Sequence, residues 1–293
     1  MPSTAYVALV TCFDADEGLN LDATRAQVRR QVAAGNGIMA AGTNGDFTAL
    51  TFDEKVALVE AVVDEAGGRV PVMANAGMPA THETVLLARE FDRMGLAGIA
   101  AITPFFIACT QDGLVRHFSR LADAVSTPVY LYDIPPRTQN HIEPETARIL
   151  AGHGNIHGIK DSGGQQETLS AYLSVGAGAD GFEVYSGPDH LVLWSLRNGA
   201  AGPISGLGNV MPETLARIVT AFDAGDEAGA EAAQARYAAF RTDLYALGYP
   251  PALVKRALWC MDPSVGASRQ PALLPDAKQD AAIRTILERY DLL

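Results

Sequence analysis

Eight short apolar segments, each of strand length, recur along this chain of 293 residues and constrain its fold more than any other feature. They occupy residues 6–12, 37–42, 70–75, 97–103, 128–132, 156–160, 182–186 and 201–205. They lack the alternation of polar and apolar side chains that marks a strand with one face in water. Continuous apolar strands of this kind are typical of a parallel sheet that is covered on both faces.

Helical segments separate these runs, and several carry recognisable start and stop signals. A Thr or Asp side chain can accept a hydrogen bond from a free N–H group at a helix start, and Glu54 stands at capping-box distance from Thr51. Glycine commonly ends a helix because it adopts the left-handed conformation without strain. The expected starts and ends are Asp22 and Gly35, Thr51 and Gly67, and Thr81 and Gly95.

Strict alternation of strands and helices is typical of βαβ units. Eight such units in about 200 residues favour a closed (β/α)8 barrel, or TIM barrel, over an open doubly wound sheet. After about residue 222 the apolar runs stop, and residues 226–248, 250–261 and 276–292 have helical patterns. We therefore expect a catalytic barrel over residues 1–222 and a helical C-terminal extension over residues 223–293, packed on the barrel and without a chemical motif of its own.

Composition excludes several classes of partner. The net charge is −12, the pI is near 4.9, and no basic stripe is present, so we expect no nucleic-acid partner. The first residues lack a basic segment followed by a long apolar core, and no run of 18 apolar residues occurs, so we expect a cytoplasmic protein that does not enter a membrane. Cys12, Cys109 and Cys260 are widely spaced and are expected to be free thiols.

In a barrel of this type, the active site lies where the strands end. The chain has four lysines and eighteen arginines, and only Lys160 ends a predicted strand. Lys55, Lys255 and Lys278 fall in helical stretches, where we expect exposed side chains. Lys160 is instead expected to point into an enclosed cavity.

Burying a cation costs several kcal/mol unless it is paired, which favours the neutral and nucleophilic form of an amine. A neutral Lys160 facing a 2-oxo acid could form an imine, which is an electron sink for making or breaking the adjacent carbon–carbon bond. Arginine could not replace it, because the guanidinium stays protonated. The alternative is that Lys160 pairs with Asp161 or Glu183 and only stabilises the barrel.

Two further strand ends carry candidate groups. Tyr132 ends the fifth predicted strand, and its phenol could pass a proton to and from the carbinolamine oxygen or the product oxygen; packing is the alternative role. The turn "GTNGDF" at residues 42–47 follows the second strand and could offer backbone N–H groups to a carboxylate, or be an ordinary turn. The six histidines lack metal-ligand spacing, so we expect no metal; His190 is a weak candidate for a substrate contact.

Four motifs at the ends of four strands together resemble the N-acetylneuraminate lyase / dihydrodipicolinate synthase family. They are "GTNGD" at 42–46, "YDIPPRT" at 132–138, "GIKD" at 158–161 and "GPIS" at 202–205. The similarity in order and spacing runs from about residue 8 to residue 213. The family has a (β/α)8 barrel with a helical C-terminal region, so the resemblance implies the same architecture.

The resemblance also implies roles for individual residues. Lys160 would form the Schiff base with pyruvate or a pyruvate-derived 2-oxo acid, so that no separate cofactor is needed, and Tyr132 would act as general acid and base. Thr43 would relay the proton, and the backbone N–H groups of Thr43 and Asn44 would hold the carboxylate of pyruvate. The backbone carbonyl of Ile204 would lie near the site.

Three positions bear on the substrate. Asn44 stands where the family often has a second hydroxyl residue. Phe106 stands where the synthase branch has a tyrosine that reaches across a dimer contact to complete a hydroxyl relay, which argues against dihydrodipicolinate synthesis. Arg137 matches the arginine with which that branch binds the second substrate's carboxylate. It would suit any acidic substrate.

We therefore expect a class I Schiff-base aldolase or lyase that acts on a 2-oxo acid of the 2-oxo-3-deoxy sugar acid type, with pyruvate as product or donor and an aldehyde as the other partner. The alternatives are 4-hydroxy-tetrahydrodipicolinate synthase, a Schiff-base dehydratase of 2-oxo-3-deoxy acids, and a ligand-binding barrel without catalysis. The resemblance also implies a homotetramer, with residues 105–109 near a subunit contact.

Overall fold

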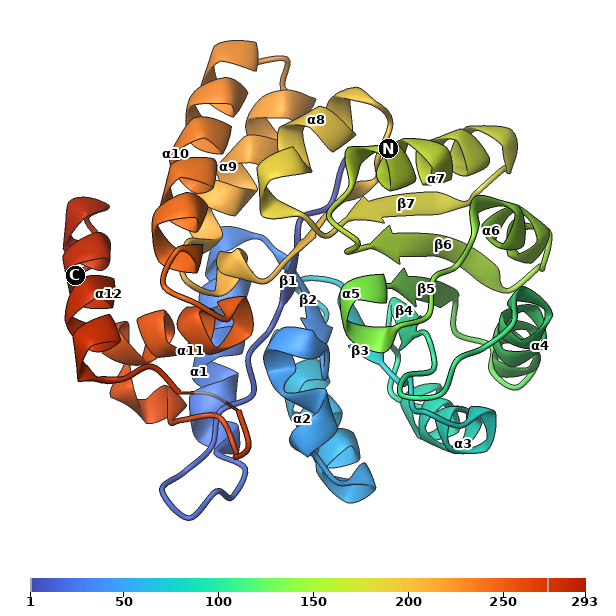
Figure 1. Cartoon of the computed structure of the whole chain (residues 1–293), viewed down its shortest axis with the longest axis horizontal. Helices are drawn as coiled ribbons and strands as arrows, with labels where there is room; N and C mark the ends of the chain where they lie inside the picture. The colour runs from blue at the N-terminus through green and yellow to red at the C-terminus, as the bar shows by residue number, and fades with distance from the viewer. Residues whose placement is uncertain (1, 273) are drawn as a thin grey trace.

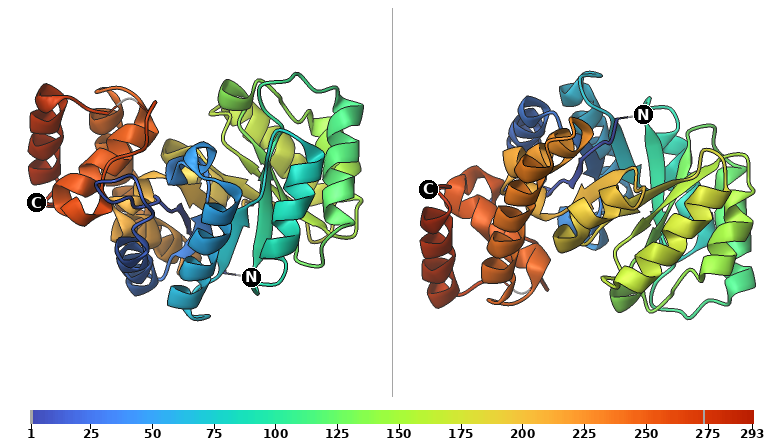
Figure 2. Two further views of the ribbon diagram at one scale, coloured as in Figure 1. Left: turned by 90° about the horizontal axis from the view of Figure 1, so that it is seen from below. Right: turned by 90° about the horizontal axis from the view of Figure 1, so that it is seen from above.

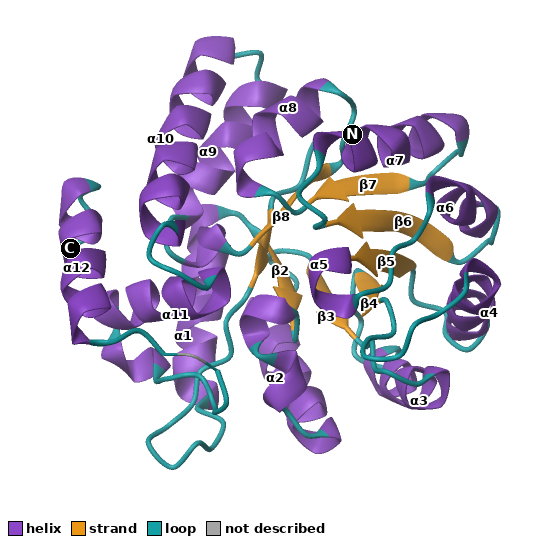
Figure 3. Ribbon diagram, viewed as in Figure 1, coloured by secondary structure: helices purple, strands orange, loops and turns teal. Residues whose placement is uncertain are grey.

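The computed structural model describes residues 2–272 and 274–293, and its eight parallel strands form a closed barrel in the order β1 to β8. The strands are β1 (Tyr6–Ala8), β2 (Gly37–Ala40), β3 (Val72–Asn75), β4 (Gly98–Ile102), β5 (Val129–Asp133), β6 (Ile156–Asp161), β7 (Glu183–Ser186) and β8 (Gly202–Ser205). Each overlaps one of the eight apolar runs, and the predicted (β/α)8 barrel is confirmed. Figure 3 shows the strands at the centre and helices around them.

Most helices that follow the strands lie around the outside of the barrel, whereas the short α5 lies near the centre of the view in Figure 1. The helices that follow the strands are α1 (Leu21–Ala34), α2 (Phe52–Ala66), α3 (Thr81–Phe91), α4 (Gln111–Ala122), α5 (Pro135–Thr138), α6 (Pro144–Ala151), α7 (Gln166–Gly178), α8 (Val192–Arg197) and α9 (Pro212–Asp223). Short 3-10 turns also follow several strands; the two used below are η1 (Thr43–Gly45) and η3 (Asp189–Leu191). Within the described residues, no helix has the length and apolar character needed to cross a membrane.

The observed helix ends agree in part with the starts and ends predicted from the sequence. Thr51 and Glu54 form the expected capping box at the start of α2, and Gly35 and Gly67 end α1 and α2. Asp22 does not cap α1, because Asn20 accepts the N–H of Ala23 instead.

The predicted start of α3 at Thr81 is confirmed, but its cap and its end differ from the prediction. The hydroxyl of Thr81 hydrogen-bonds His117 of α4 at 2.9 Å, so Ala80 is the cap residue. This helix also ends at Phe91, before the expected Gly95.

Three more helices complete the chain: α10 (Glu227–Tyr245), α11 (Pro250–Met261) and α12 (Ala277–Arg289). Both views in Figure 2 place them together on one side of the barrel. Their buried side chains, among them Tyr237, Phe240 and Leu258, share one hydrophobic cluster with Val7 of β1 and Leu215 of α9. The C-terminal helices therefore continue the core of the barrel.

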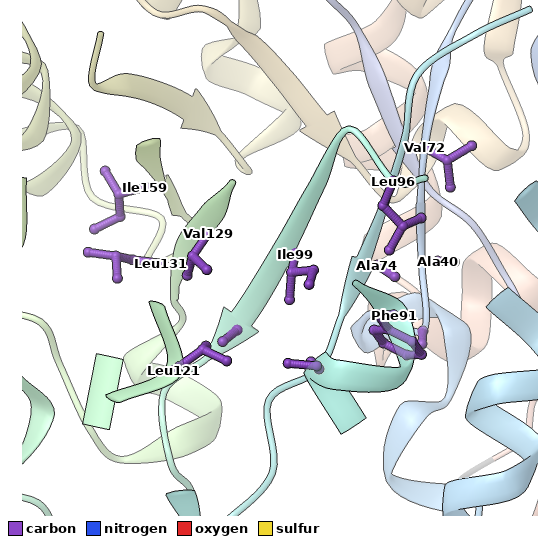
Figure 4. Close-up of a cluster of buried hydrophobic side chains, with 14 of the residues drawn as sticks. Ala40, Val72, Ala74, Phe91, Leu96, Ile99, Leu121, Val129, Leu131 and Ile159 are labelled. Carbon is purple, nitrogen blue, oxygen red and sulfur yellow. The ribbon is translucent and has the colours of Figure 1, made fainter. Parts of the chain in front are cut away.

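A second cluster fills the space between the outer faces of the strands and helices α3 and α4 (Figure 4). Ile99, Val129 and Ile159 from three strands lie in it together with Phe91 and Leu121 from the helices, and none of the five is more than 1% exposed. Burial of this kind contributes about 1.5–3 kcal/mol for each large apolar side chain, so this layer fixes the positions of the strands.

The inside of the barrel is filled by tyrosines at its amino-terminal end. The hydroxyls of Tyr130 and Tyr185 donate to Glu183 at 2.8 and 3.1 Å; Glu183 begins β7, and Tyr130 is the second residue of β5. A Cβ atom at Gly98 would lie 2.6 Å from the ring of Tyr130, so only glycine allows this ring to fit. These side chains form a tyrosine floor (Tyr6, Tyr130, Tyr185 and Glu183) beneath the carboxyl ends of the strands.

Candidate active site

A cavity of about 240 Å³ lies above this floor, at the carboxyl ends of the strands. Six of the seven predicted site residues line it: Thr43, Asn44, Tyr132, Arg137, Lys160 and Ile204. They come from βα loops or strand ends at β2, β5, β6 and β8, which are far apart in the sequence. The barrel therefore brings together the groups that the rule on strand ends selects.

Lys160 on β6 is 4% exposed and lies directly beside Tyr132 of β5 in the strand register. Its Nζ atom is 4.0 Å from the centre of the Tyr132 ring and 3.9 Å from the Met39 sulfur. Among the described residues, no carboxylate forms an ion pair with it. Glu183 bonds the floor tyrosines, and Asp161 accepts the N–H of Gly163 at 2.8 Å. The alternative in which Lys160 is a structural ion-pair partner does not occur.

Tyr132 and Thr43 form a hydroxyl pair next to this amine. Their oxygens are 3.0 Å apart, and either can donate. Tyr132 is 2% exposed, so its ring is fixed by packing inside the barrel. A hydroxyl held beside a buried amine, with a second hydroxyl behind it, can pass a proton to or from an oxygen bound at the amine.

Asn44 and Ile204 complete the inner wall of the cavity. Thr43 and Asn44 begin η1, where the first backbone N–H groups of a helix have no partner within the helix. The amide of Asn44 packs against Gly206, at which a Cβ atom would approach the amide nitrogen to 2.4 Å. The absence of a side chain at Gly206 therefore leaves room for Asn44 beside the end of β8.

Comparison with known proteins gives the family of this chain. The model of the dihydrodipicolinate synthetase family matches residues 1–290. A 4-hydroxy-tetrahydrodipicolinate synthase of Geobacter metallireducens is 33% identical over 290 residues, which cover 99% of each chain. This chain belongs to that family. Family members are class I lyases that act on carbon–carbon bonds with pyruvate through a Schiff base, and this chain is an enzyme of that class.

Two further relatives have different descriptions. An uncharacterized DapA-like lyase of Halobacterium salinarum is 37% identical over 286 residues, covering 97% of this chain and 93% of its own length. The structure of YagE, a prophage protein of the same family from Escherichia coli, was solved in complex with pyruvate. It superposes with a TM-score of 0.93 at 28% identity and covers 99% of both chains. Membership of the family therefore does not by itself specify the substrate.

The lysines correct one part of the sequence argument. Lys55 on α2 and Lys255 on α11 are 3% and 2% exposed, so the expectation of exposed side chains holds only for Lys278. Lys255 forms an ion pair with Asp46 at 2.8 Å, and burial lowers the pKa of Lys55, whose amine contacts the Met78 sulfur. Burial alone does not distinguish Lys160. Its place in the cavity beside Tyr132 and Thr43 does.

Phe106 does not line the cavity of its own chain. Its side chain is 90% exposed, the neighbouring Ile107 is 64% exposed, and the backbone of Phe106 has a φ of 75°. A bulky side chain in the left-handed region is strained, and two adjacent apolar side chains in water are unfavourable for a monomer. Within one chain, the structure therefore does not bring Phe106 together with the other predicted site residues.

The C-terminal extension supplies groups that the sequence argument missed, which corrects the expectation that it carries no chemistry. Arg241 and Tyr245 of α10 line the cavity, as do Asp189 and His190 of the loop after β7. Tyr245 donates to Asp189 at 3.2 Å and so connects the extension to the barrel. Arg241 and Tyr245 stand four residues apart and share a helix face, which is the one sequence signal that could have paired them.

Two buried carboxylates lie behind the reactive side chains. Asp133 and Asp161 follow Tyr132 and Lys160 and are paired in the strand register, so they point out of the barrel. Asp133 accepts from Ile142 N–H, His141 and the Tyr172 hydroxyl, at 2.8 to 3.0 Å. One oxygen of Asp161 has no partner, and burial raises the pKa of this carboxyl to about 6.

We expect Asp161→Asn to stabilise the protein at alkaline pH. Because the pKa of Asp161 is higher in the folded state, the folded chain holds this proton more tightly, and the stability from it is lost as pH rises through about 6. The amide removes the cost of a buried charge and can still accept the Gly163 N–H. At pH 8 the free energy of unfolding should rise by about 1–3 kcal/mol, and at pH 4 by less than about 1 kcal/mol.

Urea unfolding at both pH values measures this difference. Asp180→Asn changes an exposed carboxylate of similar size and should leave stability within about 0.5 kcal/mol at either pH. A loss of stability in Asp161→Asn that is equal at pH 4 and pH 8 would contradict the prediction.

Among the described residues, no group of three or more His, Cys, Asp or Glu side chains is placed to hold a metal ion. The three cysteines are free thiols, as expected, and Cys12 and Cys260 are buried. The groups at hand in the cavity include an amine, a hydroxyl pair, two guanidinium groups, one carboxylate and the imidazole of His190. These groups suit addition to a carbonyl followed by proton transfer.

Proposed function

We propose that Lys160 is the Schiff-base residue of a class I aldolase that cleaves or forms a carbon–carbon bond of a 2-oxo acid, with pyruvate as product or donor and an aldehyde as the other reactant. One observation carries this proposal. The Lys160 amine lies in the cavity without a carboxylate partner, 4.0 Å from the ring of a tyrosine whose hydroxyl bonds Thr43. An amine in this position, beside a hydroxyl pair that can move a proton, has the groups that imine formation with a keto carbon requires.

The proposed reaction begins when Lys160 attacks the keto carbon of the substrate and gives a carbinolamine. Tyr132 donates the proton with which the hydroxyl leaves as water, and an iminium ion forms. The iminium accepts the electron pair of the adjacent carbon–carbon bond, while Tyr132, now a base, takes the proton from the hydroxyl that becomes the aldehyde. The enamine is then reprotonated at carbon, and water releases pyruvate from Lys160.

The remaining groups orient the substrate. In this proposal the backbone N–H groups of Thr43 and Asn44 bind the carboxylate beside the keto carbon; both residues line the cavity, as does Ile204. Arg137 lines the outer part of the cavity and suits a further acidic group. No cofactor is required in this proposal, because the imine itself is the electron sink.

We further propose that the active form is a homotetramer in which residues 105–109 lie at a subunit contact. The exposed Phe106 and Ile107 support this, because contact with another subunit would remove their apolar surfaces from water. In such a contact Phe106 would approach a neighbouring site but could not add a hydroxyl to the Tyr132–Thr43 pair.

Synthesis of 4-hydroxy-tetrahydrodipicolinate is the second candidate. It is the activity named for the Geobacter metallireducens relative, and Arg137 in the cavity is compatible with it. Phe106 argues against it for the reason given above. The two candidates share the imine at Lys160 and differ in the aldehyde, so assays with aspartate semialdehyde and with sugar-derived aldehydes separate them.

Borohydride reduction in the presence of pyruvate tests the proposal. We expect one stable adduct for each chain, on the peptide that contains Lys160. The three other lysines are internal controls, since Lys55 and Lys255 are equally buried and Lys278 is exposed. No adduct in the wild-type protein, or an adduct on another lysine, would overturn the Schiff-base assignment.

A further inference from the structure

The outer part of the cavity contains two arginines whose guanidinium groups have no acceptor within residues 2–272 and 274–293. Arg137 follows β5, and Arg241 reaches the same cavity from α10. Among the described residues, no hydrogen bond or ion pair is formed by either guanidinium. Instead each stacks on an aromatic ring: Cζ of Arg137 is 4.5 Å from the centre of Tyr249, and Cζ of Arg241 is 5.1 Å from that of Tyr245. Stacking holds each guanidinium group in place and leaves its N–H groups available to a ligand.

The charge of the cavity points to an anionic ligand. Asp189 is the one carboxylate among the lining residues, and it is already bonded to the hydroxyls of Ser205 and Tyr245 at 2.5 and 3.2 Å. Burial raises the pKa of Asp189, which reduces the negative charge that this carboxyl contributes to the cavity. Arg137 and Arg241 therefore set two guanidinium charges against this one carboxylate, within a chain of net charge −12.

We propose that Arg241 binds a second anionic group at the far end of the substrate, so that the enzyme acts on 2-oxo acids with a distal carboxylate. This inference rests on the proposed function, because the imine at Lys160 sets the position of the near end. The carboxylate beside the keto carbon occupies the N–H groups of Thr43 and Asn44. The distal carboxylate then binds Arg241. This arginine belongs to the C-terminal extension, whereas Arg137 belongs to the barrel.

A structural role for Arg241 is the competing explanation. Its positive charge favours the ionised form of Asp189. Burial, and to a smaller extent the charge of Arg241, lowers the pKa of His190. Asp189 also has two hydroxyl donors and the nearby Lys160, so Arg241 is one of several groups that support it. If Arg241 only stabilised Asp189, its loss would affect all ligands to the same extent. If it binds a distal anion, only ligands with that anion should suffer.

Two 2-oxo acids of equal chain length separate the two roles of Arg241. 2-Oxoadipate and 2-oxohexanoate both form an imine and have six carbons, but only the first has a distal carboxylate. The measured quantity is the concentration of each acid that gives half-maximal borohydride trapping. Arg241→Gln should raise this concentration by about 10–100-fold for 2-oxoadipate and by less than about threefold for 2-oxohexanoate.

Two further variants complete the experiment. Arg241→Lys keeps the charge and should recover part of the preference for 2-oxoadipate. Arg236→Gln, an exposed position on the same helix, should change neither value. An equal effect of Arg241→Gln on both acids, or a wild-type enzyme that does not prefer 2-oxoadipate, would overturn the inference.

Trapping of pyruvate in the same preparations keeps the two proposals distinguishable. If pyruvate is trapped at Lys160 in the wild type and in Arg241→Gln, but discrimination between the six-carbon acids is absent, only the role of Arg241 is wrong. If the wild type does not trap pyruvate, the Schiff-base proposal is wrong, and the inference falls with it.

Discussion

Lys160→Met is expected to abolish borohydride trapping with pyruvate and to lower turnover of any 2-oxo acid substrate by roughly 10⁴-fold or more, because no other group in the cavity can form the imine. Methionine has a similar length and already occurs next to this position, since the Met39 sulfur lies 3.9 Å from the Lys160 amine. The variant should therefore fold. Trapping, steady-state rates and a melting curve check these three expectations.

Two variants are matched to it. Lys55→Met removes another buried amine that also contacts a methionine sulfur, and it should trap pyruvate like the wild type. Lys160→Arg keeps a positive charge in the cavity but cannot form an imine, so it should be as inactive as Lys160→Met. Turnover within tenfold of wild type in Lys160→Met, in a folded protein, would rule out covalent catalysis by this residue.

Tyr132→Phe is expected to lower turnover by about 10²–10⁴-fold, the range that general acid–base groups contribute, while the protein stays folded. The ring that lies 4.0 Å from the Lys160 amine remains, and only the hydroxyl that bonds Thr43 is lost. Imine formation also requires this proton, so the trapping rate should fall with turnover.

Tyr130→Phe provides the control for this variant. Tyr130 lies on the same strand and also points into the barrel, but its hydroxyl bonds Glu183 in the tyrosine floor. Its loss should affect stability and leave the rate of trapping within about threefold. Equal losses of activity in Tyr130→Phe and Tyr132→Phe would indicate a general effect of tyrosine hydroxyls on the barrel.

The strands of this fold could be predicted from the sequence, and the helix starts only in part. Each strand is buried on both faces, so its apolar run is visible without knowledge of its neighbours. A cap depends on where one hydroxyl points. Thr51 bonds within its own helix start and was predictable, whereas Thr81 bonds His117 on the next helix, a contact that exists only after folding.

The candidate site shows the same limit. Thr43, Tyr132 and Lys160 could be selected because the ends of parallel strands meet at one rim of a barrel. Arg241 and Tyr245 could not, because they lie near the C-terminal end of α10, whose packing against the barrel no local pattern encodes. The burial of Lys55 and Lys255 was missed for a related reason: their partners, Met78 and Asp46, are distant in sequence or supplied by a loop.

The tyrosine floor closes one end of the barrel, so the cavity opens to solvent only at the carboxyl ends of the strands. Lys160 is 4% exposed whereas Arg241 is partly exposed, so a group bound beside Arg241 lies nearer the opening than a reactant held at Lys160. On the proposed reaction, the aldehyde must therefore leave before pyruvate can, and in the reverse direction pyruvate must enter first. The side chains that fill the barrel thus impose an order of binding and release, and no moving lid is needed for it.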